Sequence, residues 1–145
     1  NSSVVVRREL FSQVGFISED MNINPSVDYN TWLRIARLTN AFKHIPMVLG
    51  CYETHSGGVS QRDMSISDTF AIANFTDDLT PRELSKVNQR HHYISGRYKF
   101  LKKDYSSASD ALRKSLSFES PRISIKALIM LMVIFYRSDF GFLNK

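Results

Sequence analysis

The sequence predicts an α+β fold that is predominantly α-helical, and three observations lead to this fold class. Strand-like runs of β-branched and apolar residues occur only in the first part of the chain. From residue 63 onward, apolar residues recur at helical spacing. The 145 residues are 43% hydrophobic and 23% charged, a globular composition that allows one domain or two small ones. We therefore expect an α+β region over residues 1–62, with one or two strands, and an entirely helical region over residues 63–145.

The first predicted elements are a short strand and a short helix. Residues 2–6 form a β-branched run that is typical of a strand. Apolar residues at helical spacing predict a helix over residues 7–14, and Gly15 ends it at the position that favours a left-handed residue. The polar residues 16–25 predict a loop.

A second helix is predicted to begin at Ser26, which is a favourable N-cap residue, and to end near residue 40. Its apolar stripe consists of Tyr29, Trp32, Leu33 and Ala36. Residues 42–52 then have strand character, and Pro46 predicts an edge or a bulge there. Residues 54–61 contain two consecutive glycines and predict a flexible loop.

The helical region has four predicted helices, over residues 67–75, 81–102, 105–117 and from 121 onward. Thr80, Pro81 and Glu83 form a helix start with an N-cap, a first-turn proline and a capping-box glutamate. The residues expected to face inward on the third helix are Ala108, Ala111, Leu112 and Leu116. Gly96 and Ala108 leave room for close packing of two antiparallel helices, similar to a single tetratricopeptide-like pair.

The last predicted helix contains ten consecutive apolar residues, from Ala127 to Tyr136. A membrane-spanning helix needs about 20. We therefore expect a helix buried in the protein. The alternative is a helix that lies on a membrane surface or binds a partner, and the flanking Lys126 and Arg137 suit either case.

The net charge of +5 is unevenly distributed. Residues 82–114 contain nine Lys or Arg against three Asp or Glu. Such a region could contact anionic lipid or a phosphate-bearing substrate, and the ordinary alternative is a solvated helix face. No nucleic-acid motif accompanies the charge, so we expect no nucleic-acid partner. The single cysteine, Cys51, excludes an internal disulfide and is expected to be a small buried residue.

One ordered set of motifs over residues 1–61 carries more information than any single motif. The chain reads Ser2-Ser3-Val4-Val5-Val6-Arg7-Arg8-Glu9-Leu10-Phe11, then Val14-Gly15-Phe16, Asp28-Tyr29, Trp32-Leu33-Arg34-Ile35-Ala36 and Tyr52-Glu53-Thr54-His55, with Ser60 five residues later. This order resembles the second half of bacterial family 2 glycosyltransferases of the GT-A fold. The resemblance implies that residues 1–62 are the acceptor-side part of such a domain and that residues 63–145 are a helical extension.

The resemblance implies a catalytic role for Asp28. The family's aspartate at this position is the general base of an inverting transfer, and it takes the proton from the acceptor hydroxyl. From the residues alone, Asp28 could instead cap or charge the first turn of its helix. The family has a glutamate before the base where this chain has Val27, a difference that would fit an altered acceptor, or weak or lost activity.

Four further residues are candidates for substrate binding. Tyr29 is next to the base and could contact the acceptor, whereas Trp32 could stack on a sugar or belong to the core. His55 could bind the donor diphosphate or its metal, or it could be an ordinary loop residue. Ser60 lies in the loop that would close over the donor.

The resemblance also implies partners that this sequence does not hold by itself. The family uses a nucleotide-sugar donor, a saccharide or lipid-linked acceptor, and a divalent Mg or Mn ion bound by an Asp-x-Asp motif. This chain has no Asp-x-Asp and begins at Asn1, so we expect a part of a longer enzyme, inactive alone and binding no metal. We expect it to be cytoplasmic, at the inner face of the membrane if the acceptor is lipid-linked, and to self-associate through open strand edges.

A different class of function is also compatible with the sequence. The alternative is a non-catalytic helical interaction module, which the tetratricopeptide-like pair and the basic helices favour. A nucleic-acid-binding helical domain would rest on charge alone, and its binding would depend steeply on salt.

Overall fold

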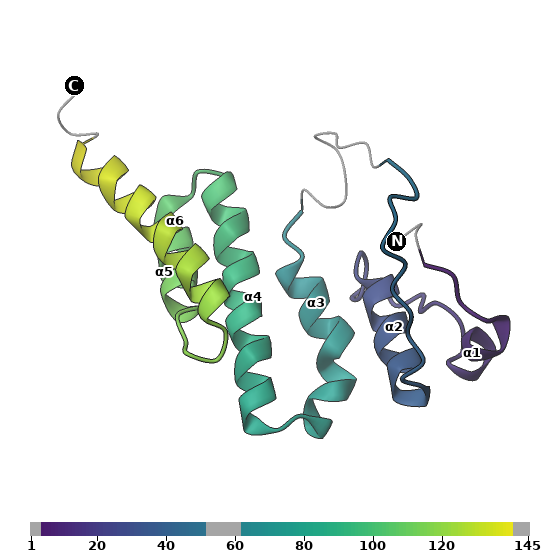
Figure 1. Ribbon diagram of the computed structural model, residues 1–145. Coiled ribbons are helices and arrows are strands. Elements are labelled where there is room, and N and C mark those ends of the chain that lie inside the picture. The colour runs from purple at the N-terminus through teal and green to yellow at the C-terminus, as the bar shows by residue number, and fades with distance from the viewer. Residues whose placement is uncertain (1–3, 52–61, 141–145) are drawn as a thin grey trace. The chain divides into compact units, whose positions relative to one another are not determined.

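Two compact units make up the protein in a computed structural model that describes residues 4–51 and 62–140 (Figure 1). Among these residues, the first unit contains 4–51 and 66–74, and the second contains 62–65 and 75–140. The first unit holds α1 (Arg8–Gln13), α2 (Val27–Leu38) and most of α3 (Ser65–Ile72). The 3-10 helix η2 (Ala73–Asp78) follows α3. The second unit holds α4 (Pro81–Leu101), α5 (Tyr105–Lys114) and α6 (Pro121–Phe140).

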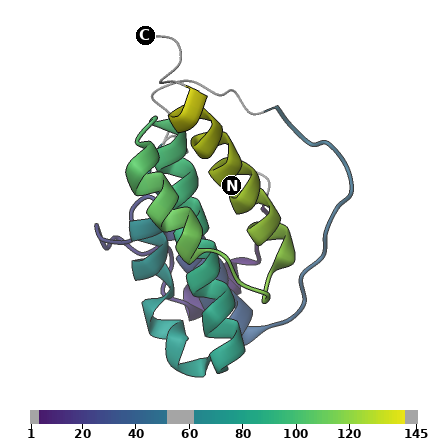
Figure 2. The same cartoon turned by 90° about the vertical axis from the view of Figure 1, so that its left-hand side faces the viewer.

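The α+β prediction is wrong, because the described part of the chain is helical and contains no strand. Residues 4–7 and 39–51, which cover the described parts of both predicted strands, have no regular secondary structure. Figure 2 shows the second of these segments as an open trace beyond the end of α2.

The missing strands have a physical cause. A strand needs a neighbouring strand to accept its backbone hydrogen bonds, and strand propensity does not provide that neighbour. The backbone N–H groups of Phe42 and Met47 donate only two residues back, to the carbonyls of Asn40 and Ile45. Cys51 lies at the end of this segment and is exposed, so the prediction of a buried cysteine is also wrong.

The turn after α1 has two residues with a left-handed backbone. Gly15 has a φ of 73°, as predicted for the residue after a helix, and Phe16 has a φ of 62°. The Arg34 guanidinium donates to the carbonyls of Val14 and Phe16, on either side of the glycine. A cation at the end of a helix also suits the helix dipole. The Val14-Gly15-Phe16 turn is therefore bound to α2.

Polar side chains join α2 to α3. Ser26 precedes α2, as predicted, but its hydroxyl does not cap the helix. It donates instead to Asp68 at 2.6 Å and lies 2.9 Å from the Ser67 hydroxyl. The Asn30 amide donates to the Ala71 carbonyl at 2.8 Å. The helix predicted over residues 67–75 begins two residues early, at Ser65, and is followed by a 3-10 helix.

The α4 and α5 helices begin as local capping rules predict. Thr80 and Glu83 form a reciprocal capping box, and Pro81 occupies the first turn. The hydrogen bonds from Thr80 lower the pKa of the Glu83 carboxyl. The Ser107 side chain and the Ser107 backbone N–H both hydrogen-bond to Asp104 and lower the pKa of its carboxyl. The bond from the backbone N–H caps α5.

The second unit has its core where α4 and α5 meet. Ala108, Ala111 and Leu112 are buried, as predicted, whereas Leu116 is 39% exposed and lies beyond the end of α5. A Cβ atom built on Gly96 would lie 2.8 Å from Leu112 Cγ. Only a glycine therefore permits this close approach of the two helices.

The last helix, α6, is less buried than its composition predicts. Ala127 is fully buried, but most of the apolar residues from Leu128 to Tyr136 are exposed. The expectation of a buried helix is therefore wrong for the outer side of α6. Neither α6 nor any other helix of the described residues is both long and apolar enough to span a membrane.

Candidate functional site

The Asp28 side chain lies in the first turn of α2, one residue after the helix begins. Its Oδ1 accepts a hydrogen bond from the Tyr29 backbone N–H at 2.6 Å. The N-terminal end of a helix stabilises a carboxylate through its free N–H groups and its dipole. The helix start therefore holds Asp28 in a defined position.

The Asp28 side chain is accessible to solvent. The residue is half-buried, so it is not sealed in the interior. No ion pair to Asp28 occurs among the residues that the structure describes. A carboxylate that is neither buried nor neutralised can accept a proton from an incoming hydroxyl group. Among residues 4–51 and 62–140, a structural ion pair is thus not what occupies this side chain.

The two aromatic candidates on α2 differ in their surroundings. Tyr29 is 38% exposed and can contact a molecule in solution. Trp32 is half-buried, and its ring meets the Phe11 ring edge-on with centroids 6.0 Å apart. The Trp32 Nε1 atom is buried and has no hydrogen-bond partner in the described part of the chain. Trp32 therefore belongs to the packing between α1 and α2.

The remaining two candidates, His55 and Ser60, lie outside the described residues. The distance of these two residues from Asp28 therefore stays outside what the structure describes. Within residues 4–51 and 62–140, no cluster of three His, Cys, Asp or Glu side chains is arranged to hold a metal ion.

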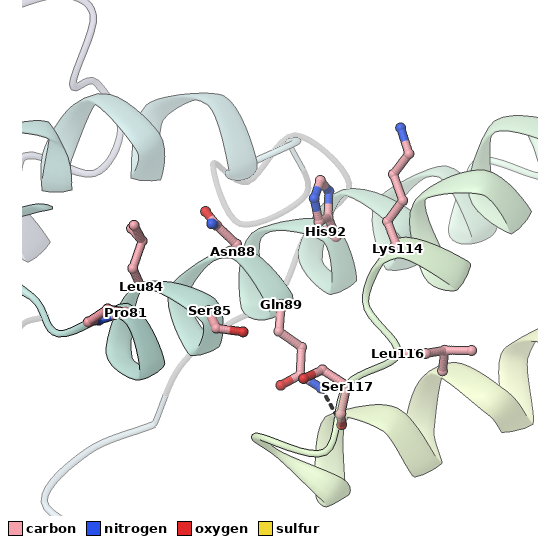
Figure 3. Close-up of a pocket in the computed structure, with 9 residues that line it drawn as sticks. All are labelled: Pro81, Leu84, Ser85, Asn88, Gln89, His92, Lys114, Leu116 and Ser117. Carbon is pink, nitrogen blue, oxygen red and sulfur yellow. Dashed lines mark hydrogen bonds between the residues drawn. The ribbon is translucent and has the colours of Figure 1, made fainter.

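A shallow pocket lies in the second unit, between α4 and the segment that follows α5 (Figure 3). Its volume is about 510 Å³. The residues that line it are Pro81, Leu84, Ser85, Asn88, Gln89, His92, Lys114, Leu116 and Ser117. The pocket has no carboxylate, and in Figure 3 the Lys114 ammonium points away from the Gln89 amide. These side chains do not converge as catalytic groups would.

Gln89 and His92 are two polar residues of the pocket, and the structure gives the surroundings of each. The Gln89 amide nitrogen donates to the Ser117 and Ser120 carbonyls and to the Ser124 hydroxyl, which ties α4 to the start of α6. Burial lowers the pKa of His92, and the nearby His91 and Lys114 lower it further. His92 is therefore mainly neutral near pH 7.

Arg34 is a residue whose role the sequence analysis did not identify. It belongs to the Trp-Leu-Arg motif, and its guanidinium binds the turn after α1 and the Thr31 hydroxyl. Its position one turn after Asn30 could have suggested an inward orientation, but the carbonyls it binds lie about twenty residues away. Only the folded chain shows that contact.

Neither a family model, nor a curated protein, nor a solved structure matches this chain. The assignment of a function therefore depends on the side chains described above.

Proposed function

We propose that this chain is the acceptor-side segment of an inverting glycosyltransferase, with Asp28 as the general base. One observation carries the proposal, namely that Asp28 is accessible, has no ion-pair partner among the described residues, and lies at the start of a helix. The ordered motifs from Ser2 to Ser60 supply the reaction class.

The proposed step needs only one protein group from this segment. Asp28 accepts the proton of the acceptor hydroxyl as the hydroxyl oxygen attacks the anomeric carbon of a nucleotide sugar. The carbon–oxygen bond to the nucleotide diphosphate breaks as the new glycosidic bond forms. The fixed helix start supports this role, because in-line attack depends on accurate placement of the base.

Two neighbours of Asp28 would select the acceptor. Tyr29 presents an exposed ring beside the base, and a phenol can both stack on a sugar and exchange hydrogen bonds with it. Val27 replaces the family's glutamate and is half-buried. An apolar side chain at this position favours an acceptor with an apolar part, such as a lipid-linked saccharide, in the cytoplasm at the inner face of the membrane.

The donor sugar and a divalent ion would be bound by residues other than those described. His55 and Ser60 remain candidates for donor binding, and His55 also for the Mg or Mn ion. We expect no transfer by this chain alone, because it contains no Asp-x-Asp motif.

The test is the substitution Asp28→Asn in the full gene product that encodes this sequence. Asparagine keeps the size of the side chain but cannot take up a proton. The variant should lose about a hundredfold to ten-thousandfold in the transfer rate, the usual contribution of general-base catalysis. Nucleotide-sugar binding, measured by calorimetry, should remain close to that of the wild type.

Asp77→Asn is the matched control, because Asp77 is an exposed aspartate in η2. It should transfer sugar at the wild-type rate. Equal rates for the two variants, or transfer that survives in Asp28→Asn, would show that Asp28 is not the base.

A second candidate function is a non-catalytic helical interaction module. The exposed apolar side of α6 favours it, because a helix rarely leaves so many large apolar residues in water. A gene product that binds no nucleotide sugar would favour this function over glycosyl transfer.

A further inference from the structure

The outer face of α6 is apolar and exposed. Its residues are each between 40% and 63% exposed: Ile125, Leu128, Ile129, Met132, Val133, Phe135 and Tyr136. Contiguous apolar surface of this kind marks a site that contacts another molecule or a membrane.

The opposite face of α6 already has a partner. Ala127 is fully buried, Ile123 and Ile134 are half-buried, and α6 contacts both α4 and α5. At 100° per residue these three side chains fall on one stripe, and the exposed residues lie on the other side of the helix. Packing within the second unit therefore does not account for the outer face.

Basic residues border the outer face. Arg122, Lys126 and Arg137 are all exposed. Neither Arg122 nor Lys126 has an acidic partner in the described part of the chain. Arg137 contacts a neutral residue, Tyr105, through a 2.6 Å hydrogen bond and a ring contact. The border of the apolar face is therefore positively charged.

We propose that the outer face of α6 binds the surface of a bilayer that contains anionic phospholipids. The apolar side chains would enter the boundary between headgroups and acyl chains, and the basic side chains would contact lipid phosphates. The helix would lie along the surface, because it is not apolar enough to cross. This inference does not depend on the proposed glycosyl transfer.

A second copy of the chain fits this face less well. Two α6 helices that pack side by side in an antiparallel pair would bring Arg122 of one copy toward Arg137 of the other. A parallel pair would place each basic residue beside the same residue of the other copy. Either arrangement places like charges together, whereas an anionic lipid surface neutralises them.

The experiment measures co-sedimentation of the whole chain with two kinds of vesicle. One kind is phosphatidylcholine alone, and the other is phosphatidylcholine with phosphatidylglycerol at about three to one. We expect binding to the anionic vesicles, weaker binding to the neutral ones, and a decrease with added salt. The Arg122→Gln/Lys126→Gln variant should bind the anionic vesicles about twenty-five-fold more weakly, at about fivefold for each cation removed.

Ile129→Glu tests the apolar part, and Ile66→Glu is its matched control. Both isoleucines are more than half exposed on helices, Ile129 on α6 and Ile66 on α3, and both changes add the same charge. Ile129→Glu should weaken vesicle binding at least tenfold, whereas Ile66→Glu should lower it only by the shared change in net charge. Circular dichroism establishes that each variant keeps its helix content.

Three results would overturn the proposal. One is a folded wild-type chain that binds neither kind of vesicle. Another is equal vesicle binding by Ile129→Glu and Ile66→Glu. The third is a wild-type dimer that Ile129→Glu alone converts to a monomer, without vesicle binding, which would assign the face to a second copy of the chain.

Discussion

Gly96 on α4 sets the distance at which α5 can pack. An added Cβ atom would meet Leu112 at three atoms, including the backbone nitrogen at 3.0 Å. A backbone atom cannot move aside as the end of a flexible side chain can. The close contact between the two helices therefore depends on the absence of a side chain at one position.

Gly96→Ala should destabilise the second unit. Overpacking a tight contact costs about 1–3 kcal/mol, and the higher helix propensity of alanine returns up to about 1 kcal/mol. We expect a net loss of about 1–2 kcal/mol in the free energy of unfolding, measured by urea denaturation and circular dichroism. Gly50→Ala is the control, because an added Cβ atom there meets nothing within 4 Å. A Gly96→Ala protein as stable as the wild type would show that the contact is not tight.

Some of these residues could be predicted from the sequence and others could not. The small residues Gly96 and Ala108 predicted a close helix pair, because small side chains at helical spacing are a local pattern. The roles of Ser26 and Arg34 were not predictable, because their partners lie between about 18 and 42 residues away. Asp28 was predicted as a candidate, and only the folded chain shows that it has no ion pair within the part that the structure describes.

At the scale of elements, the helices with capping signals begin where the sequence predicts. The Thr80 capping box and the Asp104 N-cap are built from neighbouring residues, so local sequence determines them. The predicted strands over residues 2–6 and 42–52 had strand propensity, but a strand also requires a partner that no local pattern supplies. The apolar run of α6 predicted burial, and three-dimensional packing covers only one side of it.

The link between α2 and α3 depends on Ser26. Ser26 is 1% exposed, and its hydroxyl bonds to both Ser67 and Asp68. Ser26→Ala leaves those partners without this bond and should lower the free energy of unfolding of the first unit by about 1–3 kcal/mol. Trp32 is the single tryptophan and lies in this unit, so its fluorescence reports the unfolding of this unit.

Ser12→Ala provides the comparison for Ser26→Ala. Ser12 is an exposed serine whose hydroxyl donates to the Arg8 carbonyl within α1. The unfolding midpoint of the Ser12→Ala variant should stay within experimental error of the wild-type midpoint. A similar midpoint for Ser26→Ala would show that the polar link between α2 and α3 contributes little.

At the scale of the whole molecule, two of the segments without regular structure, residues 4–7 and 39–51, expose large apolar side chains. Val5 is 98% exposed and Val48 is 93% exposed. Unpaired backbone groups beside apolar side chains favour pairing with another chain. The prediction of self-association is therefore placed on residues 4–6 and 42–51 rather than on α6.

Sedimentation velocity tests this prediction. The wild-type chain should form dimers or larger species as its concentration rises, and Val48→Lys should remain monomeric over the same range. Ile66→Lys, which changes an exposed apolar residue on α3, should associate as the wild type does. A wild-type chain that is monomeric at every concentration contradicts the prediction.

The central claim is that Asp28 deprotonates an acceptor hydroxyl in a single displacement. Proton NMR of the product formed by the full gene product tests it most directly, because a single displacement inverts the anomeric configuration of the transferred sugar. The account predicts a product with the configuration opposite to that of the nucleotide-sugar donor. A product that retains the donor configuration would contradict a general-base role for Asp28.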